Sequence, residues 1–78
     1  MSLSVNPLDQ LSPREREVLF LFLEGLAWKE IAGKLGIERV SVTHYKKRIW
    51  KKWKITSQGQ FIQFCVEYGI KPPRKEAA

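Results

Sequence analysis

The sequence predicts an all-α fold, a small four-helix domain that contains a helix-turn-helix. Apolar residues recur at intervals of three and four along four segments, which is the spacing of helices with one buried face. Glycine follows three of these segments, at Gly25, Gly36 and Gly69, where a left-handed residue can end a helix without steric cost. Ser12 and Ser57 precede two of the segments in capping positions.

The first helix is expected over residues 13–24. Ser12 and Glu15 have the spacing of a capping box, and the proline between them suits the first helical position. The apolar run that follows, residues 18–23, is too broad for a single buried face. We therefore expect Phe20 or Leu23 to face outward. The expected core side consists of Val18, Leu19, Leu21 and Phe22.

The second helix is expected over residues 26–35. Ile31 and Leu35 lie four residues apart, on what would be its buried face. Ala27 occupies the cap position, and alanine is a poor cap. We therefore expect this helix start to fray more than the start of the first helix.

The turn around Gly36 has the pattern of a helix-turn-helix. Gly36 can adopt the positive φ that ends the second helix, and Ile37 is a lone apolar residue placed to fill the corner. Ala32 is small at the point where the two helices would cross. The second helix of such a motif enters the DNA major groove. The alternative is an ordinary corner between two helices of a helical protein.

The third helix, expected over residues 39–54, has an apolar side and a polar side when projected at about 100° per residue. The apolar side is expected to pack in the core and consists of Val42, Tyr45, Ile49 and Trp53. The opposite side carries Val40, Thr43, His44, Lys47 and Lys51. Trp50 lies between the two sides, where it could cover the edge of the core, join a dimer contact or stack on a sugar.

The fourth helix is expected over residues 58–68. Ser57 and Gln60 have the spacing of a second capping box, and Gly69 ends the helix. Its apolar residues could form one side or two: Phe61, Ile62, Phe64, Cys65 and Val66.

A chain of 78 residues forms one small domain with a modest core. Cys65, the single cysteine, excludes an intramolecular disulfide and a multi-cysteine zinc site, and we expect it to pack as a small apolar residue. We expect a flexible lead-in over residues 1–10, the domain over 11–69 and a disordered basic tail over 70–78. Nothing resembles a signal peptide or a membrane span, so a cytoplasmic location is expected.

The formal charge of +6 is concentrated in one place. Six of the nine residues from 46 to 54 are lysine or arginine, and none is acidic. A basic stripe on a small domain is typical of polyanion binding. The alternative is a solvated basic face that keeps the protein in solution. The stripe continues the expected third helix, which favours nucleic acid.

Three runs of the sequence closely resemble the LuxR-type DNA-binding domain, which also occurs at the C-terminus of NarL/FixJ-type response regulators. They are LSPREREVLFLFLEGLAWKEIAGKLGI, VSVTHYKKRIWKKWKI and TSQGQFI, and the resemblance covers residues from about 11 to 65. It implies a four-helix domain that binds double-stranded DNA as a homodimer, with the third helix in the major groove. It also implies that the last helix supplies the dimer contact, and RNA polymerase is a possible further partner.

The resemblance also implies roles for individual residues. Base contacts are carried over to Thr43, His44 and Lys47. Phosphate contacts are expected from Lys29, Arg39, Ser41, Lys46, Arg48, Lys51 and Lys54. The candidate dimer contacts are Phe61, Phe64 and Cys65. No cofactor and no metal ion are expected.

The chain departs from the family pattern at several of these positions. Tyr45 replaces a customary histidine, and Thr43 replaces a favoured lysine. Trp28 stands where the family has a small polar residue and Phe61 where it has an alanine. Glu38-Arg39 replaces the usual Ser-Glu, and Arg48 a common asparagine. These departures leave the fold intact but make the target sequence unpredictable from relatives.

Other classes of function fit the sequence less well. The run EGLAWKEIA is similar to one in region 4 of RNA-polymerase sigma factors, so a sigma-like or protein-binding module is the alternative. A membrane-surface peptide would use the cations and aromatics of residues 45–55. An enzyme is not expected, because the chain has one histidine, one cysteine and no phosphate-binding glycine loop. A receiver or ligand-sensing domain has no room here, so we expect a stand-alone regulator or an excised C-terminal domain.

Overall fold

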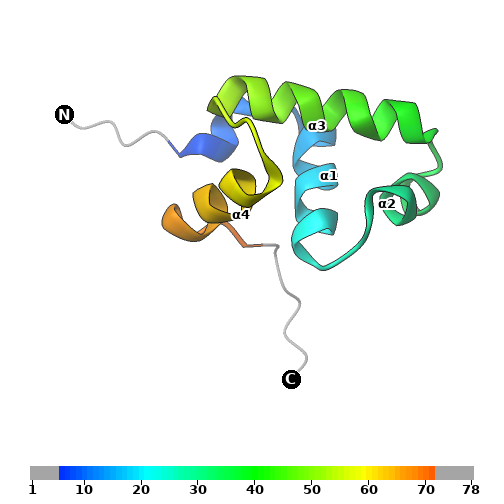
Figure 1. The fold of residues 1–78 in the computed structure, drawn as a ribbon. Coiled ribbons are helices and arrows are strands. Elements are labelled where there is room, and N and C mark those ends of the chain that lie inside the picture. Colours follow the sequence, from blue (N-terminus) through cyan, green and yellow to red (C-terminus); the bar gives the residue numbers. More distant parts are fainter. Residues whose placement is uncertain (1–5, 72–78) are drawn as a thin grey trace.

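In the computed structural model, which describes residues 6–71, the chain forms one short 3-10 helix and four α-helices (Figure 1). The expected all-α fold is confirmed: the described residues contain no strand. None of the described helices is long and apolar enough to cross a membrane. The elements are η1 (Pro7–Gln10), α1 (Pro13–Leu23), α2 (Trp28–Leu35), α3 (Arg39–Trp53) and α4 (Gln58–Glu67).

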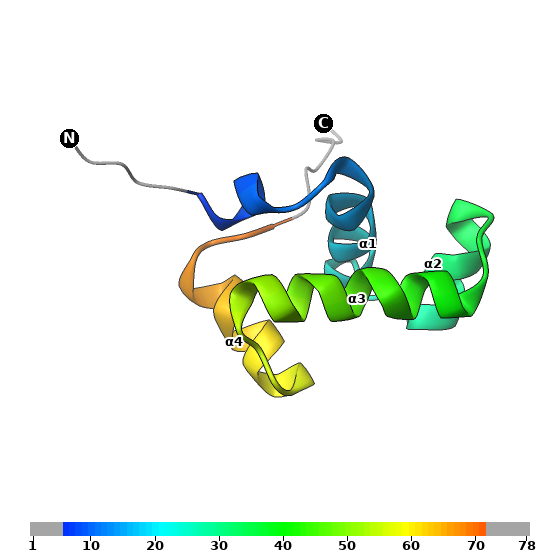
Figure 2. The same cartoon turned by 90° about the horizontal axis from the view of Figure 1, so that it is seen from above.

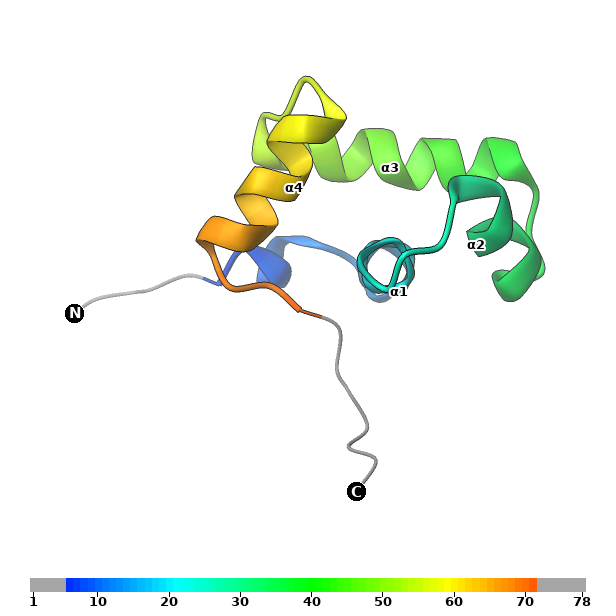
Figure 3. The ribbon, with the colours of Figure 1, turned by 60° about the horizontal axis from the view of Figure 1, so that its bottom comes forward.

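The longest helix, α3, spans the width of the molecule and packs against both α1 and α2 (Figure 1). Figure 3, which views α1 end on, places α2 beside the beginning of α3 and α4 beside its end. Seen from above in Figure 2, no other helix overlies α3. One side of α3 is therefore packed, and the other is left to solvent.

Two clusters of buried residues lie beneath α3, and they share the half-buried rings of Phe22 and Trp28. The smaller cluster joins α2 to α1 and the first half of α3, through Val18, Ile31, Ala32 and Val42. The larger cluster joins α4, and the residues that precede α1 and follow α4, to α1 and the second half of α3. Its members are Leu11, Leu19, Ile49, Trp53, Ile55, Phe61, Cys65 and Ile70.

Phe61 is the residue by which α4 packs onto the rest of the fold. Its side chain is fully buried. Its ring stacks on that of Phe22, with centroids 5.2 Å apart, and meets Trp50 edge-on at 5.7 Å and Trp53 at 6.2 Å. One aromatic side chain therefore connects α4 with both α1 and α3.

The ends of α1 follow the sequence closely. Ser12 Oγ accepts a hydrogen bond from the Glu15 N–H at 3.2 Å, and Glu15 Oε1 accepts one from the Ser12 N–H at 3.0 Å, so the capping box is confirmed.

Gly25 and Gly36, with φ of 102° and 68°, end the first two helices as expected. Lys54 ends α3 with φ of 59°, and this left-handed position at a non-glycine residue had no signal in the sequence.

The start of α2 differs from expectation. The helix begins at Trp28 rather than at residue 26. Ala27 stands at the cap without a side-chain acceptor, but its own N–H donates to Glu30 Oε1 at 2.7 Å. This is one half of a capping box, and it satisfies the alanine N–H rather than a helical one.

The start of α4 also differs in detail. Ser57 Oγ accepts from the Gln60 N–H at 3.2 Å, as a cap should. Gln60 does not return the bond to Ser57, because its Oε1 accepts from the N–H and the hydroxyl of Thr56, at 2.8 and 2.9 Å. The expected second capping box is therefore only half present.

The expected outward position of Phe20 or Leu23 is wrong. Residues 20–23 are all half-buried. Phe20, Phe22 and Leu23 pack against the larger cluster, and Leu21 packs against the smaller one. Because α1 lies between the two clusters, it has packed neighbours on more than one side.

The expected flexible lead-in is too long at its inner end, because residues 7–10 form the helix η1. Asn6 caps this helix, accepting a hydrogen bond from the Leu8 N–H at 2.9 Å. Trp53 Nε1 donates to the Pro7 carbonyl at 3.3 Å, and Arg16 Nε donates to the Leu8 carbonyl at 3.1 Å. Residues 1–5 lie outside the described residues.

The expected tail likewise starts too early. Ile70 is buried in the larger cluster, and its N–H donates to the Cys65 carbonyl at 2.9 Å. The remainder of the expected tail, residues 72–78, lies outside the described residues.

Phe61→Ala should lower the free energy of unfolding by about 3–5 kcal/mol, because it opens a cavity among three aromatic rings. Urea unfolding followed by circular dichroism would measure the change. Ile62→Ala is the matched control on the same helix: Ile62 is 46% exposed, and its loss should cost less than about 1 kcal/mol. Equal costs for the two variants would contradict the central place of Phe61 in the core.

Candidate nucleic-acid interface

The packed side of α3 is the apolar side that the sequence predicts. Val42, Ile49 and Trp53 are buried, and Tyr45 is half-buried. Their burial turns the opposite side of the helix to solvent. The exposed residues of this helix and its two caps are Glu38, Arg39, Val40, His44, Lys47, Arg48, Lys51, Lys52 and Lys54.

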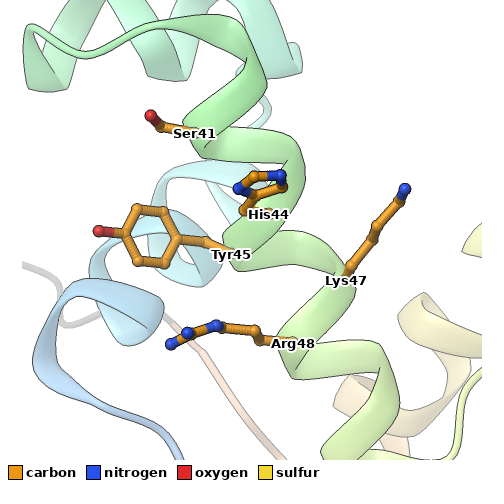
Figure 4. A pocket seen from close by; sticks show the side chains of 5 residues that line it. All are labelled: Ser41, His44, Tyr45, Lys47 and Arg48. Carbon is orange, nitrogen blue, oxygen red and sulfur yellow. The ribbon is translucent and has the colours of Figure 1, made fainter.

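A shallow hollow of about 400 Å³ lies on the exposed side of α3 (Figure 4). Tyr45 and Arg48 project from one flank of the helix and Lys47 from the other. The hollow is open, and its lining is polar and cationic in character, which suits a polyanion that lies along the helix. The lining residues are Ser41, His44, Tyr45, Lys47 and Arg48.

Two of the three predicted base contacts lie together on this surface. His44 and Lys47 are exposed and line the hollow. Thr43 is half-buried and is not among the lining residues. The structure therefore presents His44 and Lys47 more openly than Thr43.

The predicted phosphate contacts fall into two groups. Lys29 on α2, Arg39 and Lys51 on α3 and Lys54 at its C-cap are exposed, and Ser41 is half-buried in the hollow. Lys46 and Arg48, by contrast, contact other side chains of the same molecule. The basic stripe therefore does not consist of equivalent cations.

Glu15 holds two of the stripe's cations. Lys52 Nζ lies 2.8 Å from Glu15 Oε1, and Arg48 Nη1 lies 3.8 Å from Oε2. Glu15 is fully buried, whereas the Lys52 and Arg48 side chains remain 38% and 67% exposed. One buried carboxylate therefore ties the first turn of α1 to the second half of α3.

The pKa of Glu15 reflects these contacts. Burial by itself would raise the pKa, but it is outweighed by the hydrogen bonds from Lys52 and the Ser12 N–H and by the charges of Lys52 and Arg48. The net effect lowers the pKa of the carboxyl below its ordinary value of 4.5. Glu15 is therefore ionised at neutral pH despite its burial.

Lys46 contacts aromatic rings instead of an acid. Its ammonium nitrogen lies 5.1 Å from the ring centroid of Trp28 and 5.0 Å from that of Trp50. The half-buried Trp50 ring in turn meets Phe61 edge-on, so it covers the edge of the core, the first of the three positions considered for it.

Sequence reasoning missed two residues of this surface. Tyr45 packs against the smaller cluster, as expected of a core residue, but its ring also lines the hollow (Figure 4). Val40 was placed on the polar side without a role, and its side chain is 56% exposed. The replacement of the family's customary histidine by Tyr45 was the one available signal for the first.

Two of the three candidate dimer contacts are not at the surface. Phe61 and Cys65 are buried in the core of their own chain, which corrects the expectation that they contact a second copy. Phe64 is half-buried, stacked between Trp53 and Tyr68 with centroids 4.4 and 4.5 Å away. The exposed apolar residues at this end of the chain are Ile62, Val66 and Tyr68.

Burial raises the pKa of the Cys65 thiol to about 11. The thiol is therefore protonated at neutral pH. This agrees with the expectation that Cys65 packs as a small apolar residue.

Comparison with known proteins identifies the family of this chain. The family model for bacterial regulatory proteins of the luxR family matches residues 9–65, and the chain belongs to that family. The resemblance inferred from the sequence is thereby confirmed. The family is one of bacterial regulatory proteins.

Several curated relatives are similar to the chain. The transcriptional regulatory protein MctR of Rhizobium johnstonii is 39% identical over 62 residues, which cover 80% of this chain and 29% of the relative. The transcriptional regulatory protein FixJ of Azorhizobium caulinodans is 37% identical over 62 residues, with the same two shares.

The nitrate/nitrite response regulator protein NarL of Escherichia coli K12 is 41% identical over 51 residues, covering 65% of this chain and 24% of the relative. The chain thus spans less than a third of the length of each of these relatives. The comparison with solved structures found no match.

Glu15→Gln should lower the free energy of unfolding at pH 7 by about 1–3 kcal/mol, because it removes a buried charge-assisted hydrogen bond. The folded-state pKa lies below the ordinary value of 4.5, so the carboxylate stabilises the fold above pH 4.5. This contribution is lost as the pH falls through the folded-state pKa. The difference in the free energy of unfolding between wild type and variant should therefore become smaller as the pH is lowered. Urea unfolding across a pH series would measure it.

Glu17→Gln is the control for this series. Glu17 is an exposed carboxylate on the same helix, and its one ion pair within residues 6–71 is with the partly exposed Arg14 at 2.9 Å. Its loss should change stability by less than about 1 kcal/mol at any pH. A Glu15→Gln effect that is independent of pH would contradict the ion pair.

Proposed function

We propose that this chain is the DNA-binding part of a transcription regulator and that it binds a specific double-stranded sequence with α3 in the major groove. The observation that carries the proposal is the uncovered side of α3, where His44 and Lys47 lie among exposed cations. The major groove, about 12 Å wide, admits one α-helix, and the helix must present a polar side free of its own protein. Membership of the luxR family supports the same function.

The exposed centre of α3 supplies the base contacts in this proposal. Lys47 donates to O6 or N7 of guanine, and His44 offers a ring nitrogen to a base edge. Thr43 and the exposed Val40 present methyl groups that fit the thymine methyl. Sequence specificity resides in these residues, because the other cations meet phosphates that are the same at every base pair.

Phosphate contacts on both sides of the groove fix the position of α3. Lys29 reaches one strand from α2, while Arg39 and Ser41 lie at the beginning of α3 and Lys51 and Lys54 at its end. Arg48 serves the same purpose through the exposed part of its guanidinium. These contacts supply affinity and register.

A homodimer on a two-fold operator is part of the proposal, and so is a cytoplasmic location. Because Phe61 and Cys65 are buried, the dimer contact falls to the exposed apolar residues Ile62 and Val66 on α4. A contact with RNA polymerase is suggested by the proposed regulatory role alone. No residue of the structure favours the sigma-like alternative over DNA binding as a regulator.

Binding to any duplex should weaken with salt, and log K should fall by about 0.9 per log unit of salt for each phosphate neutralised. Lys51→Ala should reduce the magnitude of this slope by about 0.9, the value for one phosphate, and should weaken binding to all duplexes alike. Fluorescence anisotropy with a labelled duplex would measure both. Arg14→Ala, on α1 and partnered by Glu17, is the control and should leave the slope unchanged. A flat salt titration of the wild type would reject the proposed function.

Lys47→Ala should relax specificity at one base step by about 1–3 kcal/mol, because it removes a donor to a base edge. Selection of bound duplexes from a random pool would show the lost preference and would also reveal a two-fold site. Lys51→Ala serves as the comparison, because it should leave the selected sequence unchanged. If Lys47→Ala selected the same sequence as wild type with the same stringency, α3 would not be docked as proposed.

A further inference from the structure

Lys46 is the one cation of the stripe that lies between two indole rings. Its ammonium is 5.1 Å from the centroid of Trp28, the first residue of α2, and 5.0 Å from that of Trp50, one turn later on α3. The residue is half-buried, whereas its neighbours Lys47 and Arg48 are exposed. Cations at this distance over an indole face are attracted by the ring quadrupole.

The two rings are themselves held in place. The Trp28 ring stacks on Phe22 with centroids 4.6 Å apart and an interplanar angle of 5°, and its Nε1 donates to Gln58 Oε1 at 3.4 Å. The Trp50 ring packs edge-on against the fully buried Phe61 at 5.7 Å. The ammonium therefore rests on groups that the core has already ordered, in contrast to a lysine that is free in solvent.

The rings order Lys46 without neutralising it. The salt bridges among the described residues involve Arg14, Arg48 and Lys52, and Lys46 has no acidic partner within residues 6–71. A contact with a ring face leaves the full positive charge in place and leaves N–H donors for another acceptor. Arg48 and Lys52 differ in this respect, because each shares the carboxylate of Glu15.

We propose that Trp28 and Trp50 are positioning residues that hold the Lys46 ammonium ready for a DNA phosphate. A free lysine side chain loses considerable rotamer freedom when it is fixed against a phosphate. Here the fold removes much of that freedom before DNA arrives, so the contact forms at a smaller entropic cost. The inference rests on the proposed function, since it assigns a role within the same DNA complex.

A double-mutant cycle on the full chain tests the inference. Duplex binding would be measured across a salt series for wild type, Lys46→Gln, Trp28→Leu and the double variant, at a temperature where circular dichroism shows each to be fully folded. Lys46→Gln should reduce the salt slope by about 0.9. Trp28→Leu should weaken binding roughly three- to tenfold with the slope unchanged, because the ammonium is still present but is held by one ring instead of two. The double variant should bind like Lys46→Gln alone.

Lys51→Gln provides the matched control, because Lys51 is an exposed cation of α3 with no aromatic ring contact among the described residues. Trp28→Leu should weaken duplex binding by the same factor in the Lys51→Gln background as in wild type. Trp28→Phe keeps a ring face and should fall between wild type and Trp28→Leu. In the DNA-free protein, NMR should show the Lys46 ε-methylene protons shifted upfield by the ring currents.

Three results would overturn the inference while the proposed function stands. The first is that Lys46→Gln leaves the salt slope unchanged. The second is that Trp28→Leu weakens duplex binding by the same factor with and without Lys46. The third is that the Lys46 ε-methylene protons have their ordinary chemical shift. The first would mean that the rings withhold Lys46 from DNA. A wild-type chain that binds no duplex in a salt-dependent way would instead reject the proposed function itself, and the inference with it.

Discussion

Burial of one side of α3 is the constraint on which the rest of the structure depends. Val42, Ile49 and Trp53 each contribute about 1.5–3 kcal/mol by leaving water, so a rotation of the helix that buried its lysines instead is excluded on energetic grounds. Because a helix advances by about 100° per residue, fixing these three side chains also fixes the direction of His44 and Lys47. The core therefore determines the surface that α3 offers to a partner.

The cations of the basic stripe look equivalent in the sequence, but they make different contacts in the structure. Lys47 and Lys51 are exposed, Arg48 and Lys52 share the buried carboxylate of Glu15, and Lys46 rests on two indole rings. Glu15 therefore connects part of the stripe to the first turn of α1. A stripe that looks uniform thus combines exposed cations outside these contacts, carboxylate-paired cations and a ring-held cation.

Two departures from the family pattern meet in one aromatic cluster. Trp28 and Phe61 are 33 positions apart in the sequence, and each is larger than the residue customary at its position. Their rings lie 6.5 Å apart with planes inclined by 13°, and the ring of Phe22 stacks against both, at 4.6 Å from Trp28 and 5.2 Å from Phe61. The large residue at one position is accommodated by the large residue at the other, and together they bring α4 against the start of α2. This cluster also explains why Phe61 is removed from the surface of α4.

The sequence by itself determined the four helices, several of their ends and the outward side of α3, because these depend on spacing within a few residues. Examples are the pairing of Ser12 with Glu15, the positive φ of Gly25 and Gly36, and the recurrence of apolar residues along α3. Only the tertiary structure decided which cations are free. The contact of Glu15 with Lys52 joins residues 37 positions apart, and that of Lys46 with Trp28 crosses from one helix to another. Local periodicity carries no information about such pairs, because they exist only once packed helices bring distant residues together.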